Sequence, residues 1–213
     1  MDMETEWDGA PRTREPEGTR NRILDAALNI FSNKGYHDTR MDEIVDASHT
    51  SKGAIYFHFP NKERLFLALV DQFANLLERR ITEAIAQETR SMAKVQAALE
   101  ACLSTFGKYR RQAKKLLVQA YGLGHTFEQK RLEINERFAG LIEVYLVEAI
   151  EQGEIEPTDA EIVAHAWMGA IYNVVIRWVY TGEPEPDRIM VTLVPTLLRS
   201  VGYADDTAAT PET

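Results

Sequence analysis

Residues 39–62 constrain this chain more than any other stretch, because they predict two short helices joined by a tight turn. Thr39 and Asp42 have the spacing of a capping box, so the first helix is expected to begin there. Ile44 and Val45 follow at positions that favour a buried helical face. A helix–turn–helix of this size is a unit that proteins use to enter the major groove of DNA.

The second short helix is predicted to begin after Ser51, a good N-cap residue, and to end at Pro60, because proline interrupts helical hydrogen bonding. Ile55 and Phe59 are four residues apart and are expected to anchor the helix to a core. The outward face is polar and aromatic, and it consists of Lys52, Ala54, Tyr56, Phe57 and His58.

About fifty residues around this motif resemble the DNA-binding domain of the tetracycline-repressor (TetR) family. The matching positions are Ile23-Leu24-Asp25-Ala26-Ala27, Phe31, Gly35-Tyr36, Thr39, Ile44, Ser51-Lys52-Gly53, Tyr56, His58-Phe59, Lys62-Glu63 and Leu65. The resemblance implies an operator-DNA partner and predicts that DNA is bound by Arg40, Thr50, Ser51, Lys52, Gly53, Ala54, Tyr56, Phe57, His58 and Lys62. Lys62 is expected to contact a phosphate.

The turn departs from the family pattern. The family has Ala-Gly-Val where this chain has Ser48, His49 and Thr50. Glycine suits a left-handed conformation, and histidine adopts one at some energetic cost. Thr50 has nearly the shape of valine, but its hydroxyl group requires a hydrogen-bond partner.

The net charge of −9 is distributed unevenly. Residues 1–11 carry −4, residues 12–64 carry +1 and residues 65–213 carry −6. Affinity for DNA depends on cations close to the phosphates rather than on the net charge of a protein. The acidity therefore lies outside the predicted DNA-binding motif and does not exclude a DNA partner.

Composition also constrains the cellular compartment in which the chain is expected. The single cysteine, Cys102, excludes an intramolecular disulfide framework and is typical of a reducing cytoplasm. No signal peptide is recognised, and no apolar run is expected to reach the length of a membrane span. We therefore expect a cytoplasmic protein.

Helical periodicity continues through the chain, so the predicted fold is all-α, with about nine helices. Outside the motif, helices are expected at about 19–35, 61–87, 91–107, 109–122, 126–152, 158–180 and 186–201, with Thr158 as the cap of the sixth of these. The predicted domains are a disordered arm at 1–17, a helix–turn–helix domain at 18–63, a ligand-binding and dimerisation domain at 64–202, and a frayed tail at 203–213. Arg12 and Arg14 are either minor-groove contacts or part of a solvated tail.

The helix at 158–180 is apolar around most of its circumference, which is typical of a helix buried on several sides. Self-association about a two-fold axis explains this pattern, and the resemblance also implies a homodimer formed by the last two helices. The predicted interface residues are Val174, Val175, Trp178, Val194, Leu197 and Leu198.

Aromatic residues gather on the helices that enclose a ligand cavity in the family, so a small apolar effector of acyl or drug-like type is expected. The predicted ligand contacts are Cys102, Phe106, Tyr109, Tyr121, Phe127, Phe138, Tyr145, Trp167 and Ile171. A basic run from Lys108 to Lys115 has three open interpretations: a clamp for a ligand phosphate, a partner for acidic residues, or a solvated face. His165 follows Glu161 by one helical turn and is expected to pair with it.

Catalytic motifs are missing: there is no Gly-x-Ser-x-Gly, no HExxH, no P-loop and no dinucleotide-binding turn. We therefore expect no enzyme activity, cofactor or metal. The favoured function is a homodimeric repressor that a ligand releases from a pseudo-palindromic operator. The alternatives are a transcriptional activator and a protein-interaction adaptor that retains the motif.

Overall fold

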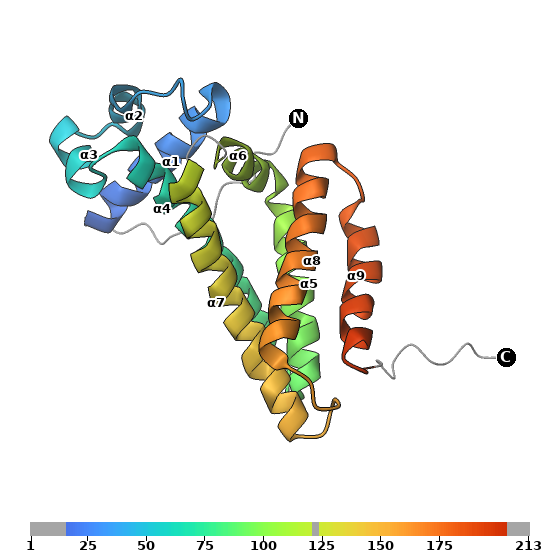
Figure 1. The fold of residues 1–213 in the computed structure, drawn as a ribbon. Coiled ribbons are helices and arrows are strands. Elements are labelled where there is room, and N and C mark those ends of the chain that lie inside the picture. Colours follow the sequence, from blue (N-terminus) through green and yellow to red (C-terminus); the bar gives the residue numbers. More distant parts are fainter. Residues whose placement is uncertain (1–15, 121–123, 204–213) are drawn as a thin grey trace. The chain divides into compact units, whose positions relative to one another are not determined.

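The computed structural model describes residues 16–120 and 124–203, which form nine α-helices and no strand (Figure 1). This confirms the all-α prediction. The helices are α1 (Pro16–Lys34), α2 (Met41–Ser48), α3 (Lys52–His58), α4 (Lys62–Ile85), α5 (Ser91–Lys108), α6 (Arg110–Ala120), α7 (Gly124–Glu151), α8 (Ala160–Thr181) and α9 (Pro186–Ser200). Arg12, Arg14 and Tyr121 lie outside the described residues.

The helices belong to two compact units. One contains the chain as far as Leu76 together with Lys115–Phe127, and the other contains Leu77–Lys114 and the chain from Glu128 onward. The division falls inside α4, so the start of this helix belongs to the same unit as α1, α2 and α3. The first half of α4 belongs with α1 because Phe66 packs on the ring of Phe31 at 5.5 Å between centroids.

The first unit has a small core between α1, α2, α3 and the start of α4. Phe31, Tyr36 and Phe66 form a mutual aromatic cluster, with Tyr36 and Phe66 rings 5.4 Å apart. Gly35 ends α1 with a positive φ of 90°, and its amide donates to the Phe31 carbonyl at 2.9 Å. The fully buried aliphatic residues are Ile23, Leu24, Ala27, Ile44, Ile55 and Leu65.

Two predicted helix starts are displaced by one residue. Arg40, not Thr39, precedes α2, and the Glu43 carboxylate accepts the Arg40 backbone N–H at 3.2 Å. Thr39 is instead buried, and its hydroxyl donates to the Gly35 carbonyl at 2.6 Å, which holds the preceding loop. At α8 the cap is Asp159 rather than Thr158, and its Oδ1 accepts the Ile162 N–H at 3.1 Å.

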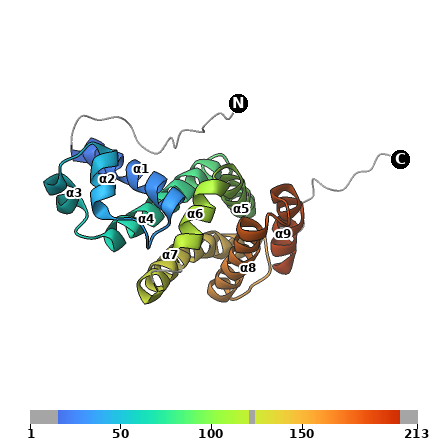
Figure 2. The ribbon, with the colours of Figure 1, turned by 90° about the horizontal axis from the view of Figure 1, so that it is seen from above.

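In the second unit, α9 packs against α5 and lies beside α8 (Figure 2). The indole N–H of Trp167 on α8 donates to Ser200 Oγ on α9 at 3.1 Å. Glu154 joins a distant segment to α5, because its two carboxylate oxygens accept the backbone N–H groups of Ser91 and Met92 at 3.1 and 3.0 Å. A carboxylate at a helix N-terminus is favourable because it meets unpaired amides and the positive end of the helix dipole.

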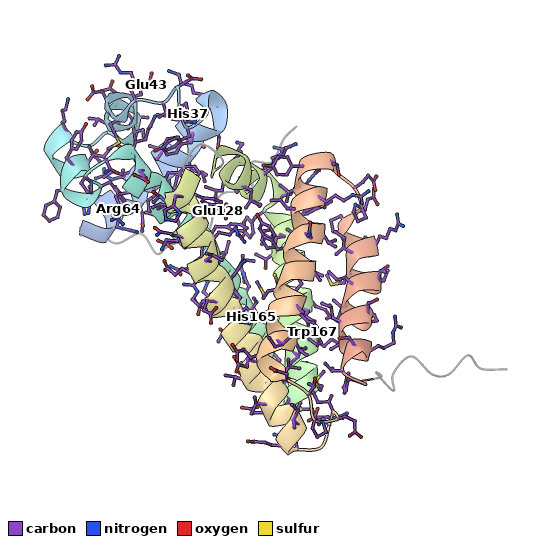
Figure 3. All side chains as sticks on the ribbon, in the orientation of Figure 1. His37, Glu43, Arg64, Glu128, His165 and Trp167 are labelled. Carbon is purple, nitrogen blue, oxygen red and sulfur yellow. The ribbon has the colours of Figure 1, made fainter. Side chains whose placement is uncertain are left out.

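His165 on α8 pairs with Glu161 through the backbone and has a second partner that the sequence pattern did not predict. Its Nδ1 lies 3.0 Å from the backbone carbonyl of Glu161, and its Nε2 lies 3.1 Å from the carboxylate of Glu136 on α7. The carboxylate partner is therefore Glu136 and not Glu161. Figure 3 labels His165 and Trp167 on α8.

Helix α8 is long and apolar enough, by length and composition, to cross a membrane; its most apolar window has a mean hydropathy of 1.3. Sequence analysis expected no such segment. Only 33% of that window is buried inside the chain. A core helix of a folded domain has the same composition, so the finding indicates a helix with a second apolar face and does not by itself indicate a membrane.

Candidate nucleic-acid interface

The turn between α2 and α3 has the left-handed geometry that the sequence pattern predicted. His49 has φ 51° and ψ 41°, and it is the only non-glycine residue with a positive φ in the described part of the chain. Its amide donates to the Asp46 carbonyl at 3.3 Å. Histidine thus occupies a conformation that glycine adopts at lower cost, and the turn forms although no glycine is present in it.

The other two unusual turn residues satisfy each other. Ser48 is buried, and its hydroxyl donates to the Val45 carbonyl at 3.1 Å. Since a hydroxyl has one proton, the 2.8 Å contact between Ser48 Oγ and Thr50 Oγ1 has Thr50 as its donor. Two departures from the family pattern therefore form one hydrogen bond between them.

Helix α3 exposes the face that sequence analysis assigned to DNA. Ser51 caps it, with Oγ accepting the Ala54 N–H at 3.1 Å, and Ile55 anchors it with a completely buried side chain. Phe57 is 83% exposed and Tyr56 is 41% exposed. Of the other predicted contacts, the exposed residues are Arg40, Ser51, Lys52 and Gly53, and the partly buried ones are Thr50, Ala54 and His58.

Lys52, at the start of α3, is held by an acidic neighbour on α2. Its ammonium group lies 2.8 Å from Asp42 Oδ1, and both side chains are more than half exposed. The hydrogen bond and charge of Lys52 lower the pKa of Asp42, and the same contact raises the pKa of Lys52. Lys52 is therefore charged and oriented before any DNA binds, and a phosphate or base must compete with Asp42 for it.

Lys62, for which a phosphate contact is predicted, is engaged by its own chain in this structure. Its ammonium group donates to the backbone carbonyls of Tyr36, His37 and Thr39 at 2.7, 3.1 and 2.9 Å. An ammonium group has three N–H donors, so these carbonyls use all of them. Lys62 also lies 4.5 Å from the centre of the Tyr36 ring, and burial lowers its pKa.

Arg64 offers the exposed cation that Lys62 does not, and sequence analysis missed it. It lies in the first turn of α4 (Figure 3), where Asn61 Oδ1 accepts its backbone N–H at 2.8 Å and so caps the helix. Its side chain is exposed, and no ion pair is found for it within residues 16–120 and 124–203. A cation next to the positive end of a helix is unfavourable unless an anion approaches. An arginine in the first turn of a predicted helix is therefore a signal that the sequence already contained.

The predicted ligand contacts fall in both units. Phe127 belongs to the first unit, and the remaining described members belong to the second. Burial raises the pKa of the Cys102 thiol to about 12, so it behaves as an apolar group. Tyr109, Phe127, Phe138, Trp167 and Ile171 are buried, whereas Cys102, Phe106 and Tyr145 are partly buried.

The predicted dimer residues are covered mainly by their own chain. Val174 is partly buried, whereas Val175, Trp178, Val194, Leu197 and Leu198 are buried in a single copy. Other positions on α8 and α9 are exposed, with Ile162 at 64% and Val191 at 72%. A free apolar surface therefore exists on these two helices, but it is made of other residues.

Comparison with known proteins identifies relatives of both the motif and the fold. Residues 23–69 match the model of the family described as "Bacterial regulatory proteins, tetR family". The HTH-type transcriptional regulator SrpR from Pseudomonas putida is 30% identical over 141 residues, which are 66% of this chain and 65% of SrpR. The match thus spans a little under two thirds of the length of SrpR.

Solved structures resemble the whole arrangement of helices. A TetR-family regulator from Syntrophomonas wolfei superposes with a TM-score of 0.78 at 18% identity, over 90% of this chain and all of that one. FadR from Bacillus subtilis, in complex with stearoyl-CoA, superposes with a TM-score of 0.72 at 21% identity, over 87% of this chain and 99% of that one. At these identities the likeness shows the fold alone.

Proposed function

We propose that the chain is a member of the TetR family of bacterial regulatory proteins and acts as a homodimeric cytoplasmic repressor that a ligand releases from operator DNA. The observation that carries this proposal is the exposed face of α3. It presents Lys52, Tyr56 and Phe57 on a short helix that Ser51 and Ile55 hold against the core. A recognition helix must combine these properties: a rigid base and a free outer face.

In this proposal the contacts divide into two kinds. Lys52, at the N-terminal end of α3, contacts a base edge or phosphate after leaving Asp42. Arg64, in the first turn of α4, contacts a phosphate without sequence preference. The exposed acid beside Lys52 weakens binding to any phosphate backbone, so it increases the relative importance of specific contacts.

Selection from a library of random duplexes tests this proposal directly. The expected product is one enriched pseudo-palindrome with half-sites about 34–36 Å apart, which is one turn of DNA. Footprinting then locates the site upstream of a gene, and a reporter compares the wild type with a deletion strain. Increased transcription on deletion supports a repressor, and decreased transcription indicates an activator. A selection that enriches no sequence would favour the alternative function, a protein-interaction adaptor.

For the dimer, we place the interface on the outward faces of α8 and α9. Ile162 and Val191 are large, exposed apolar residues on these helices. Gly169 lies between them in chain order, in the middle of α8, and a Cβ added there would meet nothing within 4 Å. A glycine in a helix interior lowers helix stability. Close approach of a helix from a second copy would explain why glycine stands at this position.

For the ligand, we propose an apolar molecule with an anionic end, such as an acyl thioester. The stearoyl-CoA complex of FadR supports this class, and so does the start of α6. Lys108 at the end of α5 and Arg111 and Lys114 on α6 are exposed, and no ion pair is found for them in the described residues. Arg110 lies among them, with its guanidinium 5.3 Å from the Trp178 ring and its Nε buried without a partner. An anion would offset this concentration of positive charge.

The proposed release acts through α4, one continuous helix whose first half belongs to the DNA-binding unit and whose second half belongs to the other. Binding free energies at two coupled sites are reciprocal, so the DNA must weaken ligand affinity by the factor by which ligand weakens DNA affinity. Titration of stearoyl-CoA against the protein, with and without the selected operator, measures both factors. The expected coupling is roughly 5–150-fold. Equal affinities would exclude the switch for this ligand, and tighter binding on DNA would make it a co-repressor.

A further inference from the structure

We propose that Phe57 reads thymine: its ring contacts the C5 methyl group of one thymine in each half-site, and Gly53 allows the helix to come close enough. This inference rests on the proposed DNA-binding function and specifies one of its contacts. It begins from an anomaly on the surface of α3. Phe57 is the most exposed of the large hydrophobic side chains in the described part of the chain, at 83%.

The position of Phe57 on α3 points it away from its own chain. Ile55 is the buried anchor of the helix, and side chains two residues from an anchor lie on the far side of a helix. Gly53 and Phe57 are four residues apart and therefore share one face. The Phe57 ring is oriented by the neighbouring His58 ring, which lies edge-on at 5.3 Å between centroids. The side chain therefore lies on the outward face of α3, near its C-terminal end.

Gly53 is a second, independent anomaly on the same face. It does not have a positive φ, and a Cβ added to it would meet only Ser51 Oγ at 4.0 Å, an ordinary contact. Nothing in the described part of the chain therefore requires glycine, although glycine lowers helix stability relative to alanine. A side chain in a helix covers the turn before its own Cα, so the Phe57 ring extends toward Gly53. The missing Cβ leaves room for another molecule.

The chemistry of the major groove selects the partner of this ring. A phenyl ring neither donates nor accepts a conventional hydrogen bond, and most groups exposed in the groove are donors, acceptors or phosphate oxygens. The only apolar group on a base edge in the groove is the thymine C5 methyl. Tyr56, beside Phe57, retains a hydroxyl group for polar contacts, so the two aromatic residues divide apolar and polar recognition.

Replacement of thymine by deoxyuridine tests the contact, because it removes the methyl group and leaves every hydrogen-bonding group in place. Duplexes of the selected operator carry deoxyuridine at one thymine position at a time, symmetrically in both half-sites. Fluorescence anisotropy measures their affinities. For wild-type protein, one position is expected to weaken binding by about fourfold per half-site, the value of one buried methyl group.

The variants separate this contact from a general loss of binding. Phe57→Ala is expected to bind the thymine and deoxyuridine operators with equal affinity. Phe57→Leu retains an apolar contact, so it is expected to retain the difference in affinity between the two operators. Tyr56→Phe is the matched control, and it retains the full deoxyuridine effect. Gly53→Ala is expected to raise thermal stability and yet weaken operator binding, a combination that a structural role for Gly53 does not produce.

Two outcomes overturn the inference, and a third overturns its premise. The first is a selected operator in which no deoxyuridine changes wild-type affinity. The second is a Phe57→Ala protein that remains as sensitive to deoxyuridine as the wild type. If selection enriches no sequence at all, the proposed DNA-binding function fails, and the thymine contact fails with it.

Discussion

At the scale of single residues, the DNA-binding unit shows how unusual side chains are accommodated in pairs. Ser48 and Thr50 each bring a hydroxyl group to a turn that alanine and valine usually form, and the two hydroxyl groups bond to each other at 2.8 Å. Asp42 holds Lys52 in a similar way at 2.8 Å. Sequence analysis identified the need of Thr50 for a partner, but it did not identify Ser48 as that partner.

A double-mutant cycle at the turn follows from this pairing. Ser48→Ala removes the acceptor of the Thr50 hydroxyl, and Thr50→Val removes the donor, so each single change is expected to lower the free energy of unfolding by about 1 kcal/mol. The double variant replaces both groups by apolar ones and is expected to be close to wild type. Urea unfolding measures all four proteins. Additive losses in the double variant would contradict the pairing.

The basic residues of the DNA-binding unit are expected to differ in their effects on the salt dependence of DNA binding and on stability. Lys52→Ala and Arg64→Ala each remove one phosphate or base contact, so each lowers the slope of log affinity against log salt by about one. Lys62→Met leaves three carbonyls without a donor and lowers the free energy of unfolding by about 1–3 kcal/mol, with an unchanged slope. A reduced slope for Lys62→Met with unchanged stability would restore the original phosphate assignment.

At the scale of elements, the existence and approximate ends of the helices could be predicted from periodicity, because each helix buries one face. The exact starts of α2 and α8 could not. Thr39 and Thr158 have good capping chemistry, but Thr39 is buried against Gly35, and Asp159 caps α8. Contacts between segments that are distant in the sequence could not be predicted either. The Glu154 carboxylate on the α5 amides joins residues 62 and 63 positions apart, which no local pattern records.

The contact between α7 and α8 is expected to depend on pH. Both ring nitrogens of His165 face acceptors, the Glu161 carbonyl and the Glu136 carboxylate, and only the protonated imidazole donates to both. The hydrogen bond to the Glu161 carbonyl, followed by the bond to Glu136, raises the pKa of His165. The stabilisation is therefore complete below the unfolded pKa of about 6.5 and is lost as pH rises through the folded value.

Comparison of wild type with His165→Gln at pH 5.5 and pH 8.5 measures this dependence by urea unfolding. The wild type is expected to exceed the variant in stability at the lower pH only. Glu136→Gln keeps the histidine and removes the carboxylate, so it is expected to reduce the same difference. An equal difference between wild type and His165→Gln at both pH values would show that the histidine is neutral in the folded chain.

At the scale of the whole molecule, the packing distinguishes the covered and exposed apolar faces of α8. The apolar circumference of α8 was identified from the sequence, but its two faces could not be assigned. The face containing Val175 and Trp178 belongs to the core of the chain, and the face containing Ile162 is exposed. Periodicity shows that a helix has two apolar faces, and only the packing of α5 and α9 decides which one is covered.

The proposed interface therefore has a specific test. Gly169→Arg together with Val191→Glu places unpaired charges on the outward faces of α8 and α9, which is costly in an apolar interface. Analytical ultracentrifugation is expected to show the 24.2 kDa monomer for this variant and twice that mass for the wild type. Glu156→Lys, an exposed change outside these helices, serves as the control. A dimeric double variant would place the interface elsewhere.

The three carbonyl contacts of Lys62 also have a consequence for chemical reactivity. The lone pair of a neutral lysine amine attacks an acylating reagent. Burial lowers the pKa of Lys62, but its contacts with three backbone carbonyls keep the nitrogen from reaching the reagent. Lys34 and Lys52, on the surface of the same unit, each release their single carboxylate partner more readily. Brief treatment with an acetylating reagent is therefore expected to label Lys34 and Lys52 well before Lys62. Late labelling of Lys62 would report the moment at which the loop between α1 and α2 detaches from α4.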